Sequence, residues 1–417
     1  MTAGPGRRPV RTLLVTGDAG AGRTTVAAAF AAAAAGYGDR VLLLTADAEA
    51  VPGLPAAPGE GTAAARAVDG VPGLAVAAID PPGSFRAVLL RAQEHTGALL
   101  SLLGAPPLDP EEVTALPGAD ALALLRALRR TRVLPEDAAP ADPPRDTAWD
   151  LVVVDLPAVR EAVRLLALPE QLRRYLRRLL PADRVAARAL RPVLAQLAGV
   201  PMPTEWAYQA AERADRELAA VQAVVEHPAT AVAVVAEPGA RAERAVRAAR
   251  TGLALYGHRT AAVVANRVLP TGSADPFLAG LSAAQQDHLK VLAETCAADG
   301  VPLLELPHLG RSPQPLAAPA ELPLPVPEAA PRAAEPWTVE DRLAEDGHYL
   351  WTLPLPGAGR EGLDLVRRGD ELVVDAGGFR RILPLPSVLR RCTVSGAALR
   401  DGALRVRFTP DPGLWPR

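Results

Sequence analysis

Nine residues near the N-terminus have the types and spacing that a phosphate-binding loop requires. Residues 17–25 are GDAGAGRTT, which fits the pattern GxxxxG[K/R]T. Gly17, Gly20 and Gly22 let backbone N–H groups face phosphate oxygens, and a following helix adds partial positive charge at its N-terminus. Thr24 is placed to bind Mg²⁺ through its hydroxyl. The alternative interpretation is a glycine-rich turn between a strand and a helix that binds no ligand.

Arg23 and Thr25 complete this candidate nucleotide-binding loop. Arg23 stands where such loops normally carry the lysine that contacts the β- and γ-phosphates. Arginine keeps the charge, but its planar head is bulkier, so we do not expect it to fit inside the loop. The chain has a single lysine, Lys290, so a composition bias is enough to explain this exchange.

The elements that must position the loop are short, continuous apolar runs separated by helical stretches. This pattern predicts an α/β fold with a parallel sheet covered by helices on both faces, and function at the carboxyl ends of the strands. The predicted strands are residues 13–16, 41–44, 74–79, 151–154, 232–235, 262–265 and 303–306.

We expect this domain to cover residues 1–312, with helical inserts at about 84–132 and 159–226 forming a helical subdomain. The second insert is either an amphipathic helical region with a solvated basic face or a surface that holds an apolar client. Its basic residues are Arg173, Arg174, Arg177 and Arg178.

Two further segments follow this domain. Residues 313–345 are rich in proline and alanine, which favours an extended linker. Residues 346–417 contain short alternating segments with glycine turns, which predict a small β-sandwich.

The composition excludes several classes of function. A formal charge of -2 and a pI near 6.4 argue against a bulk nucleic-acid binder. Cys296 and Cys392 are far apart, which excludes a disulfide framework and a CxxC metal site within one chain. These cysteines fit a reduced, cytoplasmic setting. No apolar run approaches the ~20 residues needed to span a bilayer.

In its motifs and their order, the chain resembles the family of arsenical-pump ATPases and tail-anchored-protein targeting factors, which are deviant P-loop ATPases. The family loop is GKGGVGKTT, and its other motifs resemble segments of this chain in the same order. These segments are residues 42–47, 78–81, 149–155 with 164–170, and 266–270. The C-terminal segment resembles the α-crystallin domain of small heat-shock proteins.

The resemblance implies roles for particular residues. It implies ATP and Mg²⁺ as cofactors, with Asp47 positioning the attacking water, Asp155 joining Thr24 at the metal, and Asn266 contacting adenine. The alternatives are that Asp47 and Asp155 cap the helices that follow them and that Asn266 is a turn residue. The resemblance also implies a homodimer, with a hydrophobic protein client or membrane-protein segment as partner.

The chain departs from the family where the family does chemistry. Asp18 replaces a signature lysine that reaches the partner's phosphates, and Leu156, Arg160 and Glu161 replace the Thr, Gly and His of the second switch. Phosphoryl transfer depends on positioned positive charge, metal and water, so these changes should cost several kcal/mol of transition-state stabilisation.

Four functional hypotheses follow. The first is a nucleotide-dependent homodimer that handles hydrophobic clients and hydrolyses ATP slowly or not at all. The second is a non-enzymatic scaffold with a vestigial site, in which Asp18 and Arg23 pair with each other. The third is an arsenite-pump subunit, which two isolated cysteines do not support. The fourth is a competent ATPase in which Arg23 replaces the lysine and another arginine takes over the role lost at 18.

Overall fold

The structure is a computed structural model of the 417-residue chain. It describes residues 10–51, 65–102, 107–131, 149–179, 205–314, 316, 322, 324–327 and 336–413. Within these residues, no helix combines the length and the apolar character needed to cross a membrane.

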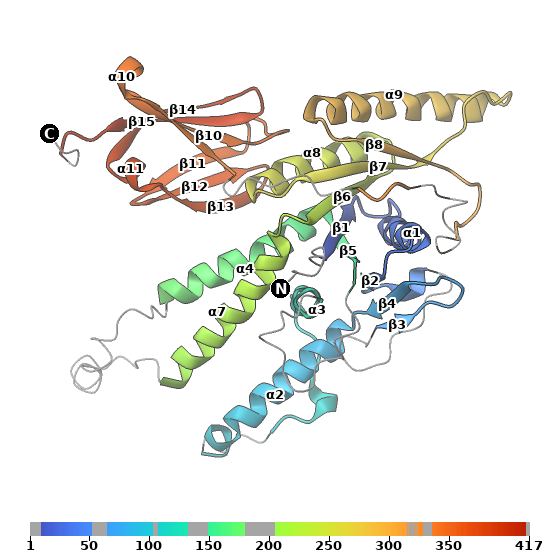
Figure 1. The fold of residues 1–417 in the computed structure, drawn as a ribbon, viewed down its shortest axis with the longest axis horizontal. Coiled ribbons are helices and arrows are strands. Elements are labelled where there is room, and N and C mark those ends of the chain that lie inside the picture. The colour runs from blue at the N-terminus through green and yellow to red at the C-terminus, as the bar shows by residue number, and fades with distance from the viewer. Residues whose placement is uncertain are drawn as a thin grey trace, which may run out of the picture.

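An eight-stranded, mostly parallel sheet forms the centre of the first domain (Figure 1), in the order β3-β4-β2-β5-β1-β6-β7-β8. Its central strands are buried on both faces, as their continuous apolar sequences predict. The strands are β1 (Arg11–Gly17), β2 (Val41–Thr45), β3 (Arg66–Ala67), β4 (Leu74–Ala78), β5 (Leu151–Ala158), β6 (Thr230–Ala236), β7 (Thr260–Val268) and β8 (Leu303–Pro307).

Helices cover both faces of this sheet. One face packs against α1, whose consecutive alanines favour the helix and let it lie close to the strands. The other face packs against α3, α4, α7 and α8. The helices are α1 (Arg23–Gly36), η1 (Ala48–Ala50), α2 (Pro81–Leu102), η2 (Pro110–Glu112), α3 (Ala119–Arg130), α4 (Val159–Leu179), α7 (Glu205–Val225), α8 (Ala240–Leu255) and α9 (Pro276–Asp299).

Part of the segment predicted to be an extended linker is packed structure. Leu322 and Leu324 are buried in the same cluster as the α1 side chains. Strand β9 (Thr338–Arg342) also lies inside the predicted linker and pairs with β10, so the sandwich begins before residue 346. The sequence of β9 is charged and exposed, and it therefore lacks the apolar alternation that marks the other strands.

The C-terminal segment is a β-sandwich of a four-stranded sheet, β14-β15-β10-β9, and a three-stranded sheet, β11-β12-β13. Trp351, Leu353, Val406 and Phe408 are among the side chains buried between the sheets. Its remaining elements are α10 (Leu343–Asp346), β10 (His348–Pro354), β11 (Leu363–Arg368), β12 (Glu371–Ala376), β13 (Phe379–Pro384), α11 (Ser387–Arg390), β14 (Cys392–Arg400) and β15 (Ala403–Pro410).

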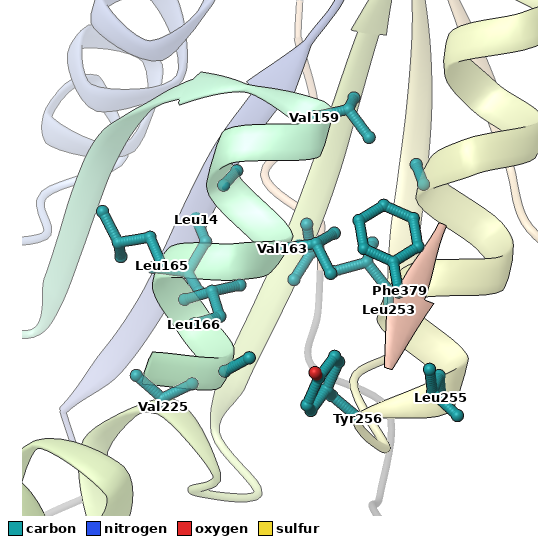
Figure 2. Close-up of a cluster of buried hydrophobic side chains, with 14 of the residues drawn as sticks. Leu14, Val159, Val163, Leu165, Leu166, Val225, Leu253, Leu255, Tyr256 and Phe379 are labelled. Carbon is teal, nitrogen blue, oxygen red and sulfur yellow. The ribbon is translucent and has the colours of Figure 1, made fainter. Parts of the chain in front are cut away.

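The sandwich packs directly on α4 and α8. Phe379 of β13 belongs to the same buried cluster as Val163 of α4 and Leu253 of α8 (Figure 2). A Cβ at Gly252 would lie 2.7 Å from the Phe379 ring, so the helix backbone itself touches this side chain. The two domains therefore share one core on this side of the sheet.

Charged pairs reinforce the same interface. Arg381 of β13 donates to Glu170 of α4 at 3.1 Å, and Arg174 of α4 donates to Glu371 of β12 at 2.6 Å. Arg173 instead pairs with Asp215 of α7. The basic side of α4 is therefore partly neutralised by α7 and by the sandwich.

Candidate functional site

The phosphate-binding loop connects β1 to α1, at the carboxyl end of the central strand. A Cβ at Gly17 would lie 2.0 Å from the Val235 carbonyl oxygen, so only glycine allows β1 to end this close to β6. Gly20 and Gly22 both have positive φ, 81° and 85°, and Gly22 immediately precedes the first residue of α1. The strand, turn and helix that the motif requires are therefore present in this order.

Thr24 and Asp155 meet beside the loop. The Thr24 hydroxyl donates to Asp155 Oδ2 at 2.8 Å, and the Thr45 hydroxyl donates to the same oxygen at 2.9 Å. Mg²⁺ prefers hard oxygen ligands in an octahedron with bonds of about 2.0–2.1 Å, which puts neighbouring ligands roughly 3 Å apart. The hydroxyl of Thr24 and the carboxylate of Asp155 therefore fit a magnesium site in chemistry and in spacing.

The Asp155 carboxyl is held in an unfavourable environment for its charged form. Burial raises the pKa of Asp155, and the nearby charge of Asp47 raises it further. The hydroxyls of Thr24 and Thr45 and the charge of Arg23 act in the opposite direction. A bound cation would offset the burial, because it favours the ionised carboxylate.

Asp47 follows the carboxyl end of β2, lines the same cavity as Thr24 and Asp155, and is exposed. Its backbone N–H donates to the Thr45 hydroxyl at 3.0 Å, while its side chain makes no cap hydrogen bond with η1. Asp155 lies within β5, before α4 begins. The carboxylate of Asp47 therefore does not cap η1, and Asp155 is not at the N-terminus of α4.

Asp47 and Asp155 face a cavity of about 550 Å³ that also contains Thr24 and Arg23. The rest of its wall is largely apolar and comes from α3, α4 and the segment after β4. These wall residues include Ile79, Ala121, Leu124, Leu165 and Leu168. Asp120 of α3 and Glu161 and Arg164 of α4 also line it, so charged groups lie both next to the loop and on these helices.

The two residues of the loop that replace family lysines, Asp18 and Arg23, have separate hydrogen-bond partners. Arg23 donates through Nη1 to the Leu156 carbonyl oxygen at 2.7 Å, so its head lies against β5 rather than inside the loop. The Asp18 carboxylate accepts a hydrogen bond from the backbone N–H of Ala19 at 2.9 Å. The ion pair between Asp18 and Arg23 that the scaffold hypothesis allowed is not among the contacts of the described chain. Thr25 lies half-buried in the first turn of α1.

Asn266 supports the loop from the neighbouring strand β7. Its amide donates to the Ala21 carbonyl oxygen at 2.8 Å, and its own side-chain oxygen accepts from the Arg267 N–H at 3.0 Å. A Cβ at Gly22 would lie 2.5 Å from Asn266 Nδ2. Asn266 is therefore a strand residue that holds the loop, rather than a turn residue.

The sequence missed two residues of this site. The Thr45 hydroxyl is the second that donates to Asp155. Its place at the carboxyl end of a predicted strand could have identified it as a site residue. Arg267 donates to the Gly20 carbonyl oxygen at 3.0 Å and to Glu237 at 2.8 Å. Its φ of 60° is unusual for a residue other than glycine, which indicates that the surrounding contacts hold it in place.

Comparisons with known proteins match both halves of this architecture. A family model described as an anion-transporting ATPase matches residues 10–309, and one described as an HSP20-like domain found in ArsA matches residues 346–408. Protein SCO2128 of Streptomyces coelicolor is 54% identical over 412 residues, which cover 98% of this chain and 100% of that protein. Protein Rv2184c of Mycobacterium tuberculosis is 30% identical over 458 residues, covering 97% of each chain. An Aquifex aeolicus protein, named as a proposed arsenical pump-driving ATPase, is 25% identical over 256 residues, covering 59% of this chain and 63% of the relative.

Proposed function

Because the chain belongs to the anion-transporting ATPase family and carries an HSP20-like domain, we propose that it is a nucleotide-dependent, homodimeric factor that handles hydrophobic protein clients. ATP hydrolysis by this factor is weak or absent. Members of the family use nucleotide and Mg²⁺ and often act as dimers. In this proposal the chain binds nucleotide and Mg²⁺ as other members do, but hydrolyses ATP slowly or not at all.

The observation that carries the proposal is that the metal ligands are in place, while Arg23 is held by a backbone carbonyl and Asp18 has the opposite charge to the family lysine. Thr24 and Asp155 are 2.8 Å apart and suit Mg²⁺, whereas Arg23 is bonded to the Leu156 carbonyl and Asp18 is an anion. Bound Mg²⁺ would supply positive charge at the phosphates. The chain itself brings no lysine to the γ-phosphate, and each ~1.4 kcal/mol of lost transition-state stabilisation slows the reaction tenfold.

Exposed apolar side chains on α4 support client handling. Leu172, Tyr175 and Leu179 are spaced at helical intervals and are 38%, 53% and 76% exposed. They lie on the half of α4 that extends away from the nucleotide loop. An apolar stripe of this kind suits an apolar client segment, because burying it against the client removes nonpolar surface from water.

Two assays test the proposal. Calorimetry with Mg-ATP should give saturable binding that is lost in Thr24→Ala, while phosphate release stays far below the usual range of about 1–10³ s⁻¹ for enzyme turnover. Suppression of aggregation of a model apolar client should fall in Leu172→Gln/Tyr175→Gln. Phosphate release at a normal enzymatic rate would contradict the impaired chemistry, and unchanged suppression would contradict the client surface.

A second candidate is a non-enzymatic scaffold with a vestigial nucleotide site. It is favoured by the amide of Asn266, which is already bonded to the Ala21 carbonyl, and by Arg267, which is bonded to the loop at Gly20. These contacts would hold the loop without any ligand. Complete absence of nucleotide binding at millimolar concentration would support the scaffold and overturn the first proposal.

A further inference from the structure

Four arginines and one histidine gather on the outer face of the four-stranded sheet of the sandwich. They line a groove of about 300 Å³ and are Arg342, His348, Arg400, Arg405 and Arg407. We call this surface the arginine face. The residues of β15 alternate, so Arg405 and Arg407 are exposed while the intervening Val406 is buried.

The strand register brings these side chains together from four strands. Arg407 of β15 pairs with Leu350 of β10 on one side and with Gly396 of β14 on the other. Arg342 of β9 pairs with His348 of β10. Neighbouring strands lie about 4.8 Å apart, so a single extended ligand can reach several of these side chains.

Gly396 shapes the groove. A Cβ at this position would lie 2.8 Å from Arg407 Nη2 and 3.2 Å from its Nε, so the guanidinium rests directly on the strand backbone. The strand register also shifts between Val394 and Gly396. Ala397 and Ala398 follow Gly396 along the groove, and their small side chains leave space above the strand.

The charge on the arginine face is only partly compensated. Arg342 pairs with Glu340 at 2.7 Å, and Arg405 lies 3.5 Å from an Asp401 carboxylate that is 83% exposed. For Arg400 and Arg407, the described part of the chain provides no acidic partner within ion-pair distance. Two guanidiniums are therefore available to a ligand, in a protein whose net charge is -2.

We propose that the arginine face binds an extended acidic peptide segment of a partner protein. Guanidinium groups bind carboxylates through two parallel hydrogen bonds, which suits glutamate and aspartate side chains. A nucleic acid fits less well, because single strands bind through aromatic stacking and none of the described residues that line the groove is Phe, Tyr or Trp. In Figure 1 this sheet is the upper layer of the sandwich, while β13 of the lower layer contacts α4 and α8. The peptide and the ATPase domain therefore do not compete for one surface.

The test uses the full-length protein and a short fluorescein-labelled peptide of alternating glutamate and threonine. Fluorescence anisotropy should show saturable binding that weakens as ionic strength rises. The double variant Arg400→Gln/Arg407→Gln should lose affinity by about tenfold, because two charge-assisted contacts disappear. Its thermal unfolding should match the wild type, since both side chains are exposed.

Matched controls decide between outcomes. Arg368→Gln/Arg391→Gln makes the same change of charge at exposed sandwich positions outside the groove and should bind within about twofold of the wild type. A peptide with glutamine in place of glutamate should not bind. Equal binding of the glutamine peptide, equal loss in the control variant, or tighter binding of an oligonucleotide of equal charge would overturn the proposal. None of these outcomes depends on nucleotide binding at the loop.

Discussion

Replacing Arg381 with methionine removes one of the cations that join the sandwich to the ATPase domain. Arg381 is 9% exposed, donates to Glu170 at 3.1 Å and to the Leu255 carbonyl oxygen at 2.9 Å, and lies 5.5 Å from the centre of the Tyr256 ring. Methionine keeps an unbranched apolar stem but is shorter than arginine and makes none of the polar contacts. Glu170 and the Leu255 carbonyl then lose their partner at an interface that excludes most water.

The size of this effect follows from the contacts. A hydrogen bond to a charged group contributes about 1.5–3 kcal/mol, and breaking a fully buried ion pair costs about 3–5 kcal/mol. The Glu170 side chain is 27% exposed, so water solvates part of the unpaired charge and lowers the cost. We therefore expect Arg381→Met to reduce the free energy of unfolding by about 2–4 kcal/mol.

Urea unfolding followed by tryptophan fluorescence and by circular dichroism measures this loss. Trp149 lies in the first domain and Trp351 is buried in the sandwich, so tryptophan fluorescence reports on both domains. The neighbouring variant Arg380→Met is the control, because the Arg380 side chain is 66% exposed and its pair with Asp375 should contribute less than about 1 kcal/mol. A loss below about 1 kcal/mol in Arg381→Met, or an equal loss in both variants, would refute the reasoning.

Three further predictions concern the loop and its neighbour Asp155. Asp18→Lys should tighten binding of Mg-ATP by at least about tenfold, because two unit charges at 4 Å interact by about 4 kcal/mol at an intermediate dielectric. Gly22→Ala should destabilise the protein by about 1–3 kcal/mol, because φ is positive and the new Cβ would meet Asn266 Nδ2 at 2.5 Å. Asp155→Asn should raise Tm at neutral pH. Since the pKa of Asp155 is raised in the folded state, the wild type loses stability as pH rises through that pKa, and the neutral amide avoids this loss.

Each of these three has a decisive comparison. Asp18→Asn should give a smaller gain than Asp18→Lys, and equal affinity in wild type and both variants would contradict the role given to charge. Gly20→Ala tests the specificity of the Gly22 effect, because φ is similar at Gly20 but no atom lies within 4 Å of its Cβ position. The Tm gain of Asp155→Asn should shrink as pH falls toward about 3.9, and a gain that is constant with pH would exclude the titration of this carboxyl as its cause.

The sequence predicts the parallel sheet because its strands are buried on both faces. Leu151 to Val154 form an unbroken apolar run, and the structure buries all of them in β5. A buried strand of this kind can be recognised from its local sequence alone, without knowledge of its partners in the sheet. Strand β9 was missed because Thr338–Arg342 is an exposed edge strand whose pairing depends on β10.

The loop could be predicted from its glycines and threonines, but the direction of its side chains could not. Arg23 is directed by the Leu156 carbonyl, and Asn266 by the Ala21 carbonyl, both distant in the chain. The contact between Arg381 and Glu170 is also invisible in the sequence, because it exists only once two domains pack together. These contacts arise from tertiary packing, which local patterns do not encode.

Calorimetric titration of the wild-type protein and of Thr24→Ala with Mg-ATP tests the central claim most directly. Thr24 lies 2.8 Å from Asp155 and is the residue through which the loop would hold the metal. We predict saturable binding by the wild type that depends on Mg²⁺ and is lost in Thr24→Ala. Absence of binding by the wild type at millimolar nucleotide, or equal binding by the variant, would contradict the claim that this loop is a working nucleotide site.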